Sequence, residues 1–380
     1  MTRSLLHHVP HGAMAYAGKR VCAQRARRAK WNELCMCNCA RAQQVCIHTR
    51  AARACVYAAR RPRGKGTAAK PRSMPASCAD LPAPFRHAVL TAATPFLGSL
   101  ALPDGRVLAF HAYGLGFPVV FIPGQLNSRL FEPAWGESES IAKQAGARVL
   151  QIDRPGYGAS TGPPSKGYAS FGNDVAFLLD SLRVESCAVM GYSSGGPYAL
   201  GISAVLGSTR VHRTCLVAAD GPYAHRELER ERLHSYKHAE PLTVDQAVEH
   251  VTEFVTGLRG LYEKTKDPAR RASCLRDLDE ALRNGLEAAA QDSVNETNAW
   301  DIDLKRVGAA VFVCGSEDHT VLPSVSEHVM TLVNGPAQMI LIEGENHTLI
   351  KRHFARILAA LGLPPTSPSS PPQPDAKGKM

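Results

Sequence analysis

The sequence predicts an α/β fold in which a mostly parallel central sheet is flanked by helices. Between about residues 95 and 362, short apolar runs alternate with amphipathic segments of helical period, which is the pattern of strands joined by helices. The apolar runs are bounded by Gly, Pro or Asp, residues that end strands. A Gly-x-Ser-x-Gly pentapeptide, Gly191–Gly195, lies between one such run and an apolar helical segment. Together these observations favour one large α/β domain with a serine on a strand-to-helix turn.

Eight apolar runs are candidates for the strands. The first two flank the pair Asp104-Gly105, which is a hairpin signal. Before the fifth run, apolar side chains within residues 175–182 recur at helical spacing and predict one packed helix. The predicted strands are Leu100–Leu102, Val107–Tyr113, Val119–Ile122, Arg148–Ile152, Cys187–Met190, Thr214–Ala218, Ala309–Cys314 and Met339–Ile342.

A long interval between Ala219 and Lys305 contains no predicted strand. Apolar residues recur there at helical spacing from Val244 to Leu258, and a second helix is indicated from Leu275 to Leu286. Helices of this size suit a lid over one end of the sheet. We therefore expect a helical cap at about residues 221–305, inserted after the sixth strand.

The basic charge of the chain lies almost entirely in its first 80 residues. This segment holds 16 of the 44 Lys and Arg residues and two of the 34 acidic residues, so its net charge is +14 and that of the rest is −4. It has no sustained apolar period, and we expect an unstructured basic arm at 1–80. The mildly acidic domain at 95–362 offers no basic face, so nucleic acid is not an expected partner. The Pro- and Ser-rich tail, 363–380, is also expected to be unstructured.

Cysteine usage and the basic arm bear on the cellular compartment. Seven of the eleven cysteines precede residue 80 and the other four are scattered, which in a chain of this length favours a reducing, intracellular compartment. The Arg- and Ala-rich, acid-poor arm resembles a mitochondrial presequence. A cytoplasmic protein and a start assigned too early, with Met74 as another start, are the alternatives. The spacing of the cysteines between Cys35 and Cys46 fits none of the usual zinc patterns, and no apolar run approaches the roughly 20 residues of a membrane span.

The segment Gly191-Tyr192-Ser193-Ser194-Gly195-Gly196 carries the sharpest chemical signal. A serine on such a turn has strained backbone angles and projects its hydroxyl from the carboxyl end of the sheet, while the flanking glycines let strand and helix pass closely. The backbone N–H of Ser194 then lies at the start of a helix, where it can face a developing oxyanion. The competing interpretation is a Gly- and Ser-rich loop that carries the pentapeptide by chance.

This motif in its context resembles the α/β-hydrolase superfamily, over about residues 99–362. The resemblance implies a loop after the third strand that supplies a second oxyanion N–H. The segment Ile122–Arg129 occupies that place, and the donor is assigned to the backbone of Gln125, although Pro123 stands where many members have His. The turn Asp153–Gly158 matches the family's turn after the fourth strand and is expected to shape the floor of the site, without proton transfer by its Asp.

The same resemblance implies an acid after a late strand and a base after the last strand. Asp318 matches the position of the acid, with Glu317 and Asp220 as alternatives. His347 matches the position of the base, whereas His319 precedes a helix and would have to fold back. The chain order Ser, Asp, His is the order that this fold requires.

The residues therefore predict a serine hydrolase that forms an acyl-enzyme on Ser193. His347 takes the serine proton, Asp318 orients the imidazole, and the N–H groups of Gln125 and Ser194 bind the oxyanion. A small-molecule ester or related acyl compound is the expected substrate, and neither a cofactor nor a metal is expected. Dehalogenases and epoxide hydrolases of this fold use Asp as nucleophile, so Ser193 argues against both. A peptidase, a thioesterase, an acyltransferase and a ligand receptor built on this fold are the alternatives.

Overall fold

The computed structural model describes residues 44–49, 52–57, 86, 89–234 and 242–364. They belong to two units, divided after Arg61, and each unit is described by itself. In the first unit, β1 (Gln44–Thr49) and β2 (Ala52–Tyr57) pair antiparallel. These strands differ from the expected unstructured arm, and both segments contain the Val, Ile or Tyr that favours extended backbone. The other residues of the expected arm, and residues 365–380 of the expected tail, lie outside the described ranges.

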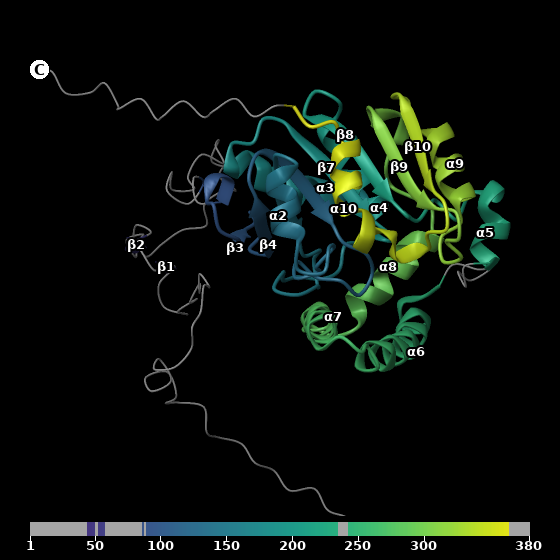
Figure 1. The fold of residues 1–380 in the computed structure, drawn as a ribbon, viewed down its shortest axis with the longest axis horizontal. Helices are drawn as coiled ribbons and strands as arrows, with labels where there is room; N and C mark the ends of the chain where they lie inside the picture. Colours follow the sequence, from purple (N-terminus) through teal and green to yellow (C-terminus); the bar gives the residue numbers. More distant parts are fainter. Residues whose placement is uncertain (1–43, 50–51, 58–85, 87–88, 235–241, 365–380) are drawn as a thin grey trace, which may run out of the picture. The chain divides into compact units, whose positions relative to one another are not determined.

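An eight-stranded sheet forms the centre of the second unit, in the order β10-β9-β8-β7-β5-β6-β4-β3 (Figure 1). The strands β3 and β4 form the predicted hairpin, β4 is also antiparallel to β6, and the other neighbouring pairs are parallel. The predicted α/β fold and all eight predicted strands are confirmed, with small shifts at the strand ends. The strands are β3 (Phe96–Ala101), β4 (Val107–Gly114), β5 (Phe117–Ile122), β6 (Ala147–Ile152), β7 (Cys187–Tyr192), β8 (Val211–Val217), β9 (Ala310–Gly315) and β10 (Ala337–Ile342).

Helices cover both faces of the sheet. On β7, Met190 lies in the buried cluster that includes Phe354, whereas a Cβ added to Gly191 would lie 2.8 Å from Ala199 Cβ. Because successive residues of a strand point to opposite faces, the helices that carry Phe354 and Ala199 lie on opposite sides of the sheet. The longer helices outside the cap are α2 (Ser138–Gln144), α3 (Tyr168–Leu182), α4 (Gly195–Leu206), α9 (Pro323–Leu332) and α10 (Ile350–Ala360), and the short η3 (His347–Leu349) precedes α10.

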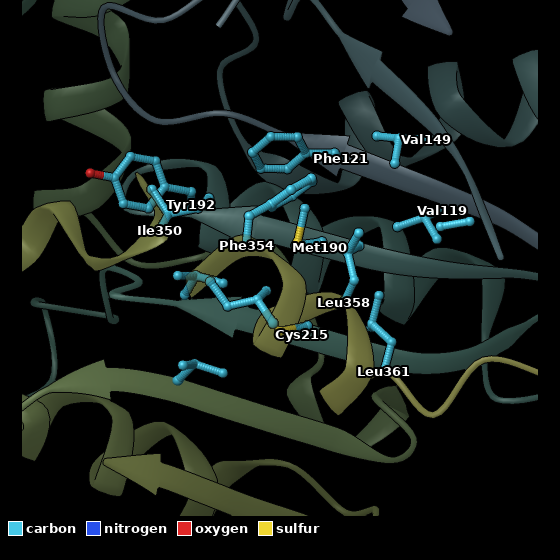
Figure 2. Close-up of a cluster of buried hydrophobic side chains, with 14 of the residues drawn as sticks. Val119, Phe121, Val149, Met190, Tyr192, Cys215, Ile350, Phe354, Leu358 and Leu361 are labelled. Carbon is cyan, nitrogen blue, oxygen red and sulfur yellow. The ribbon is translucent and has the colours of Figure 1, made fainter. Parts of the chain in front are cut away.

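The core between α10 and the sheet connects two parts of the candidate site. Figure 2 shows Phe121 of β5, Met190 of β7 and Cys215 of β8 beside Phe354 and Leu358 of α10, and each is at most 1% exposed. Burying a large apolar side chain contributes about 2 kcal/mol. This packing fixes α10, which follows the predicted base, against β7, which precedes the predicted nucleophile.

The predicted cap is inserted between β8 and β9, the sixth and seventh strands of the sheet. No strand occurs among the described residues of this interval, and none of the described helices has the length and apolar character of a membrane span. The second predicted helix reaches only Ala281 instead of Leu286, and sequence reasoning missed α8. The cap contains η1 (Arg226–Leu228), α5 (Glu229–His234), α6 (Val244–Glu263), α7 (Pro268–Ala281), α8 (Glu287–Thr297) and η2 (Leu304–Arg306).

Candidate active site

Ser193 lies on a sharp turn between β7 and α4. Its φ angle is +52°, in the left-handed region, which costs a residue with a side chain about 1–3 kcal/mol. The neighbouring glycines allow this turn because a Cβ on Gly195 would lie 2.2 Å from the carbonyl oxygen of Ile122, and one on Gly196 would lie 2.3 Å from Ala219 Cβ. The strained turn directs the serine side chain away from the end of β7.

The structure brings Ser193, His347 and Asp318 together. The Nε2 atom of His347 lies 3.0 Å from Ser193 Oγ, and its Nδ1 atom lies 2.9 Å from Asp318 Oδ2. The side chain of Asp318 is fully buried, whereas that of His347 is 19% exposed. A neutral imidazole that donates its Nδ1–H to the carboxylate presents an unprotonated Nε2 to the hydroxyl. This arrangement allows His347 to take the proton of Ser193.

Parallel pairing of β9 and β10 brings the segment that carries Asp318 close to the segment that carries His347. Gly315, the last residue of β9, is in register with Ile342, the last residue of β10. Just beyond them, the N–H of Glu317 donates to the carbonyl oxygen of Glu345 at 2.9 Å. A Cβ on Gly315 would lie 2.1 Å from that carbonyl oxygen, so the close approach of the two loops requires glycine.

Backbone donors orient the carboxylate of Asp318. Its Oδ1 atom accepts hydrogen bonds of 2.9 Å from the N–H groups of Thr320 and Val321. The other oxygen, Oδ2, is the one that faces His347.

The alternative residues do not reach the imidazole. Glu317 and His319, on either side of Asp318, are both exposed. Asp220 accepts hydrogen bonds from the hydroxyls of Ser194 at 3.1 Å and Tyr223 at 2.9 Å, which place it beside the serine turn.

Tyr192 supports the loop that carries His347. Its hydroxyl donates to the carbonyl oxygen of His347 at 3.2 Å, and the two rings lie 5.5 Å apart. The Tyr192 ring also stacks on Phe131 at 5.7 Å. The residue between Gly191 and Ser193 thus contacts the base as well as forming part of the turn.

The segment Ile122–Arg129, which is predicted to supply an oxyanion N–H and is called the oxyanion loop below, runs beside the serine. A Cβ added to Gly124 would lie 3.1 Å from Ser193 Cβ, so this loop approaches the nucleophile closely. Among the described residues, no backbone carbonyl or side chain accepts a hydrogen bond from the backbone N–H of Gln125 or of Ser194. The side chain of Gln125 donates to the carbonyl oxygen of Ala289 at 2.7 Å and to Ser293 Oγ at 2.8 Å, and these contacts attach the loop to α8.

A buried ion pair that sequence analysis missed joins this loop to the cap. The guanidinium of Arg154 donates to the carbonyl oxygens of Pro123 and Gly124 and, at 2.8 Å, to Asp292 of α8. Both charged side chains are only 2% exposed. The hydroxyls of Tyr157 and Tyr198 donate to the Asp292 carboxylate at 2.6 and 2.8 Å. This cap carboxylate is thus bound by three residues that lie outside the cap.

A second cap carboxylate holds the continuation of the loop. Asp277 of α7 accepts hydrogen bonds from the N–H and hydroxyl of Ser128, at 2.9 and 2.7 Å, and from the amide of Asn127 at 2.9 Å. Burial raises the pKa of the Asp277 carboxyl to about 6, although these hydrogen bonds oppose the increase. Two cap helices therefore contact the segment that follows β5.

Asp153 has the contacts expected of a structural residue. It is buried, and it accepts hydrogen bonds from the N–H of Ala159 at 2.9 Å and from the guanidinium of Arg129 at 2.6 Å. Burial raises the pKa of its carboxyl, and Arg129 opposes the increase. A Cβ on Gly158 would lie 2.2 Å from Asp153 Oδ2, so the turn closes on the carboxylate itself.

A cavity of about 700 Å³ lies between the oxyanion loop and the cap. Gln125 contributes to its wall, and α6 lines it with Val251, Phe254, Leu258 and Leu261. Phe254 is 47% exposed and Leu261 is 64% exposed, so the cavity opens to solvent along an apolar edge. Its volume is in the range of small-molecule sites, and its lining combines these apolar side chains with the polar residues His250, Glu253, Ser293 and Thr297.

Comparison with known proteins supports the same family. The sequence model of the alpha/beta hydrolase family matches residues 119–360. A putative non-heme chloroperoxidase of Synechocystis is 32% identical over 116 residues, which are 30% of this chain and 41% of that protein. An sn-1-specific diacylglycerol lipase of Danio rerio is 30% identical over 91 residues, which are 24% of this chain and 28% of that protein. The chain thus spans less than half the length of these curated relatives.

Solved structures share the fold of the second unit. A bromoperoxidase from Bacillus anthracis matches with a TM-score of 0.54 and 21% identity, over 70% of this chain and 98% of that one. An esterase from Exiguobacterium antarcticum gives a TM-score of 0.55 at 18% identity, and epoxide hydrolase A from Mycobacterium thermoresistibile gives 0.55 at 20% identity. Each of these two matches covers 70% of this chain and 97% of the solved structure. At these identities the likeness concerns the fold.

Proposed function

Because the chain belongs to the alpha/beta hydrolase family, we propose that it is a serine hydrolase that cleaves a small-molecule ester or related acyl bond through an acyl-enzyme on Ser193. The observation that carries this proposal is the continuous contact from Ser193 Oγ to His347 Nε2, at 3.0 Å, and from His347 Nδ1 to Asp318 Oδ2, at 2.9 Å. A nucleophile, a base and an orienting acid in this geometry activate a serine hydroxyl.

The first half of the reaction acylates the serine. His347 Nε2 takes the hydroxyl proton while Ser193 Oγ attacks the acyl carbonyl, and the resulting oxyanion accepts hydrogen bonds from the N–H groups of Gln125 and Ser194. The carboxylate of Asp318 stays ionised and stabilises the imidazolium. His347 then gives its proton to the leaving alcohol, and the acyl group remains on Ser193.

The second half releases the acyl group. Water enters, His347 takes one of its protons, and the hydroxide oxygen attacks the acyl carbon of the ester on Ser193. The same two N–H groups stabilise the second oxyanion. When it collapses, Ser193 Oγ leaves with the proton from His347, and the enzyme returns to its starting state with a carboxylic acid as product.

The cavity beside Gln125 supports an apolar group on the substrate. Its apolar side chains come from α6, and Gln125 joins it to the proposed oxyanion site. A cavity of about 700 Å³ falls within the usual range of roughly 300–1,000 Å³ for small-molecule sites. We therefore assign the acyl chain of the substrate to this cavity.

A fluorophosphonate probe tests the proposed nucleophile, since it phosphonylates an activated serine. We expect the full chain to react at Ser193 and Ser193→Ala to remain unlabelled, with loss of ester turnover on the order of 10⁶. p-Nitrophenyl esters and aminoacyl anilides measured side by side separate an esterase from a peptidase on the same triad. Wild-type protein that never reacts, or labelling that persists in Ser193→Ala, would overturn the assignment.

A further inference from the structure

A second cluster of ionisable side chains lies outside the triad, where the chain enters the cap. His225 and Glu227 lie between β8 and α5, with Glu227 in η1, and His328 lies in α9. One ligand atom from each side chain falls within 4.8 Å of the other two. No other group of His, Cys, Asp and Glu in the described part of the chain meets this spacing.

The two imidazoles of the cluster bring nitrogen atoms close together. His225 Nδ1 and His328 Nε2 lie 3.4 Å apart, and the ring planes are inclined by 72°. This separation is longer than that of a normal N–H hydrogen bond, about 2.7–3.2 Å. Two nitrogens bound tetrahedrally to zinc at about 2.0–2.1 Å are separated by about 3.3–3.4 Å. The observed distance of 3.4 Å matches the edge of such a tetrahedron.

Buried packing beneath the cluster holds its two sides together. Tyr223 and Leu228, which flank the first two ligands in sequence, form a small core with Val321 and Val325. A Cβ on Gly221 would lie 2.5 Å from Val325 Cγ1, so the segment is tightly apposed to α9. Buried packing thus holds the two backbone segments that carry the three side chains, and an ion would not have to order a loop to bind.

We propose that His225, Glu227 and His328 form a site for a zinc-type divalent metal ion, with water as the fourth ligand. Two imidazoles and one carboxylate are donors that zinc takes in proteins. The ion would join the start of the cap to α9, the helix that follows the loop of Asp318. Because His225 and Glu227 are exposed, the ion exchanges with solvent, and the site stabilises the fold without entering the reaction at Ser193.

Zinc binding by the full chain tests the site. The seven cysteines before residue 80 can bind zinc themselves, so the informative quantity is the difference between variants. We expect the double variant His225→Ala/His328→Ala to hold one zinc equivalent fewer than wild type after equilibrium dialysis. The matched control is His212→Ala, which removes an exposed histidine outside the cluster and keeps the wild-type zinc content. Zinc should also raise the unfolding temperature of wild type more than that of the double variant.

Equal zinc content and equal thermal shifts in wild type and the double variant would overturn the proposal. If the double variant does not fold, cobalt titration of wild type and of Glu227→Gln tests the metal site instead, because Glu227 is exposed and its substitution leaves the buried core unchanged. Four-coordinate Co²⁺ has intense visible absorption, and thiolate ligands add charge-transfer bands in the near ultraviolet. We expect wild type to show the visible bands of a site without thiolate, and Glu227→Gln to weaken that site roughly tenfold or more. Identical titrations of the two proteins contradict the site.

Discussion

The guanidinium of Arg154 donates a hydrogen bond of 3.1 Å to the carbonyl oxygen of Gly124, which belongs to the same peptide group as the N–H of Gln125. A trans peptide is planar, and its C=O and N–H point in opposite directions. By holding the carbonyl, Arg154 therefore fixes the direction of the proposed oxyanion donor. The same guanidinium binds Asp292 of the cap, so the orientation of that donor depends on the contact between cap and core.

Arg154→Lys is expected to lower kcat on the order of 10²-fold with a small change in KM. An ammonium group cannot bridge two carbonyls and a carboxylate in the planar geometry of a guanidinium, and loss of an oxyanion donor costs about 10²–10³ in kcat. The measurement is the split between kcat and KM for a p-nitrophenyl ester.

Stability has to be separated from positioning in this test. A variant that removes only Arg154 leaves Asp292 buried without its cation, which costs roughly 3–5 kcal/mol. The double variant Arg154→Met/Asp292→Asn removes both charges and keeps an amide oxygen as acceptor beside the hydroxyls of Tyr157 and Tyr198, so we expect it to unfold at a higher temperature than Arg154→Met without recovering kcat. Recovery of both quantities would show that Arg154 acts only through stability.

Asp318→Asn is expected to lower turnover roughly 10⁴-fold with little change in unfolding temperature. The amide favours the imidazole tautomer that cannot accept the serine proton. Glu317→Gln should cost far less because that side chain is exposed. Asp220→Asn should also cost less turnover, since its carboxylate accepts hydrogen bonds from the hydroxyls of Ser194 and Tyr223. A large, stability-neutral loss in Asp220→Asn alone would assign the acid to the end of β8.

Gly257→Trp is expected to shorten the preferred acyl chain. Gly257 lines the cavity, and a Cβ added to it meets no atom within 4 Å, so an indole there would project into space that the acyl chain is proposed to fill. Each excluded methylene loses about 0.8 kcal/mol, so four of them should lower kcat/KM for p-nitrophenyl octanoate roughly 100-fold or more while butyrate is little affected.

Gly260→Trp is the matched control for this experiment. Gly260 lies on the same helix, a Cβ there also meets no atom within 4 Å, and it does not line the cavity. Its chain-length profile should equal that of wild type. If both variants give the wild-type profile but still react with the fluorophosphonate, the acyl chain lies elsewhere and the serine assignment stands.

Sequence reasoning could place Ser193 and His347 because each is tied to a local pattern that follows a strand. Asp318 and Asp220 both follow strands as well, and only the close approach of the β9 and β10 loops distinguishes them. The cap carboxylates Asp277 and Asp292 could not be found, because their partners lie 94 to 150 residues away in the chain.

The end of α7 was mispredicted for a related reason. The apolar period from Leu275 continues through Leu282 to Leu286, and both of the latter pack against the cap core. They do so from a turn and not from a helix, because Gly285 between them has a φ angle of +106°. The repeat of apolar residues in this segment reflects which side chains are buried, whereas backbone conformation decides where the helix ends.

The stability difference between wild type and Asp277→Asn is expected to depend on pH between about 4 and 6. An unfolded Asp titrates near 3.9, whereas burial raises the pKa of Asp277 in the folded protein to about 6. Between these values the folded state binds the extra proton, so the free energy of unfolding falls as pH rises through the window and is constant above it. The asparagine variant does not titrate. The stability of wild type relative to the variant should therefore fall by about 2 kcal/mol from pH 4 to pH 7.

The comparison with the variant is needed because His111 titrates in the same range. Burial lowers the pKa of His111 to about 4, so its contribution to the free energy of unfolding rises with pH where that of Asp277 falls. The neutral amide of the variant can still accept the hydrogen bonds from Ser128, but it points an N–H at Asn127, which adds a constant cost. Urea unfolding of both proteins at pH 4, 5, 6 and 7 gives the slope, and the constant cost drops out of it. A difference that stays constant over this range would mean that the Asp277 carboxylate has an ordinary pKa, and that its hydrogen bonds from the oxyanion loop fully offset its burial.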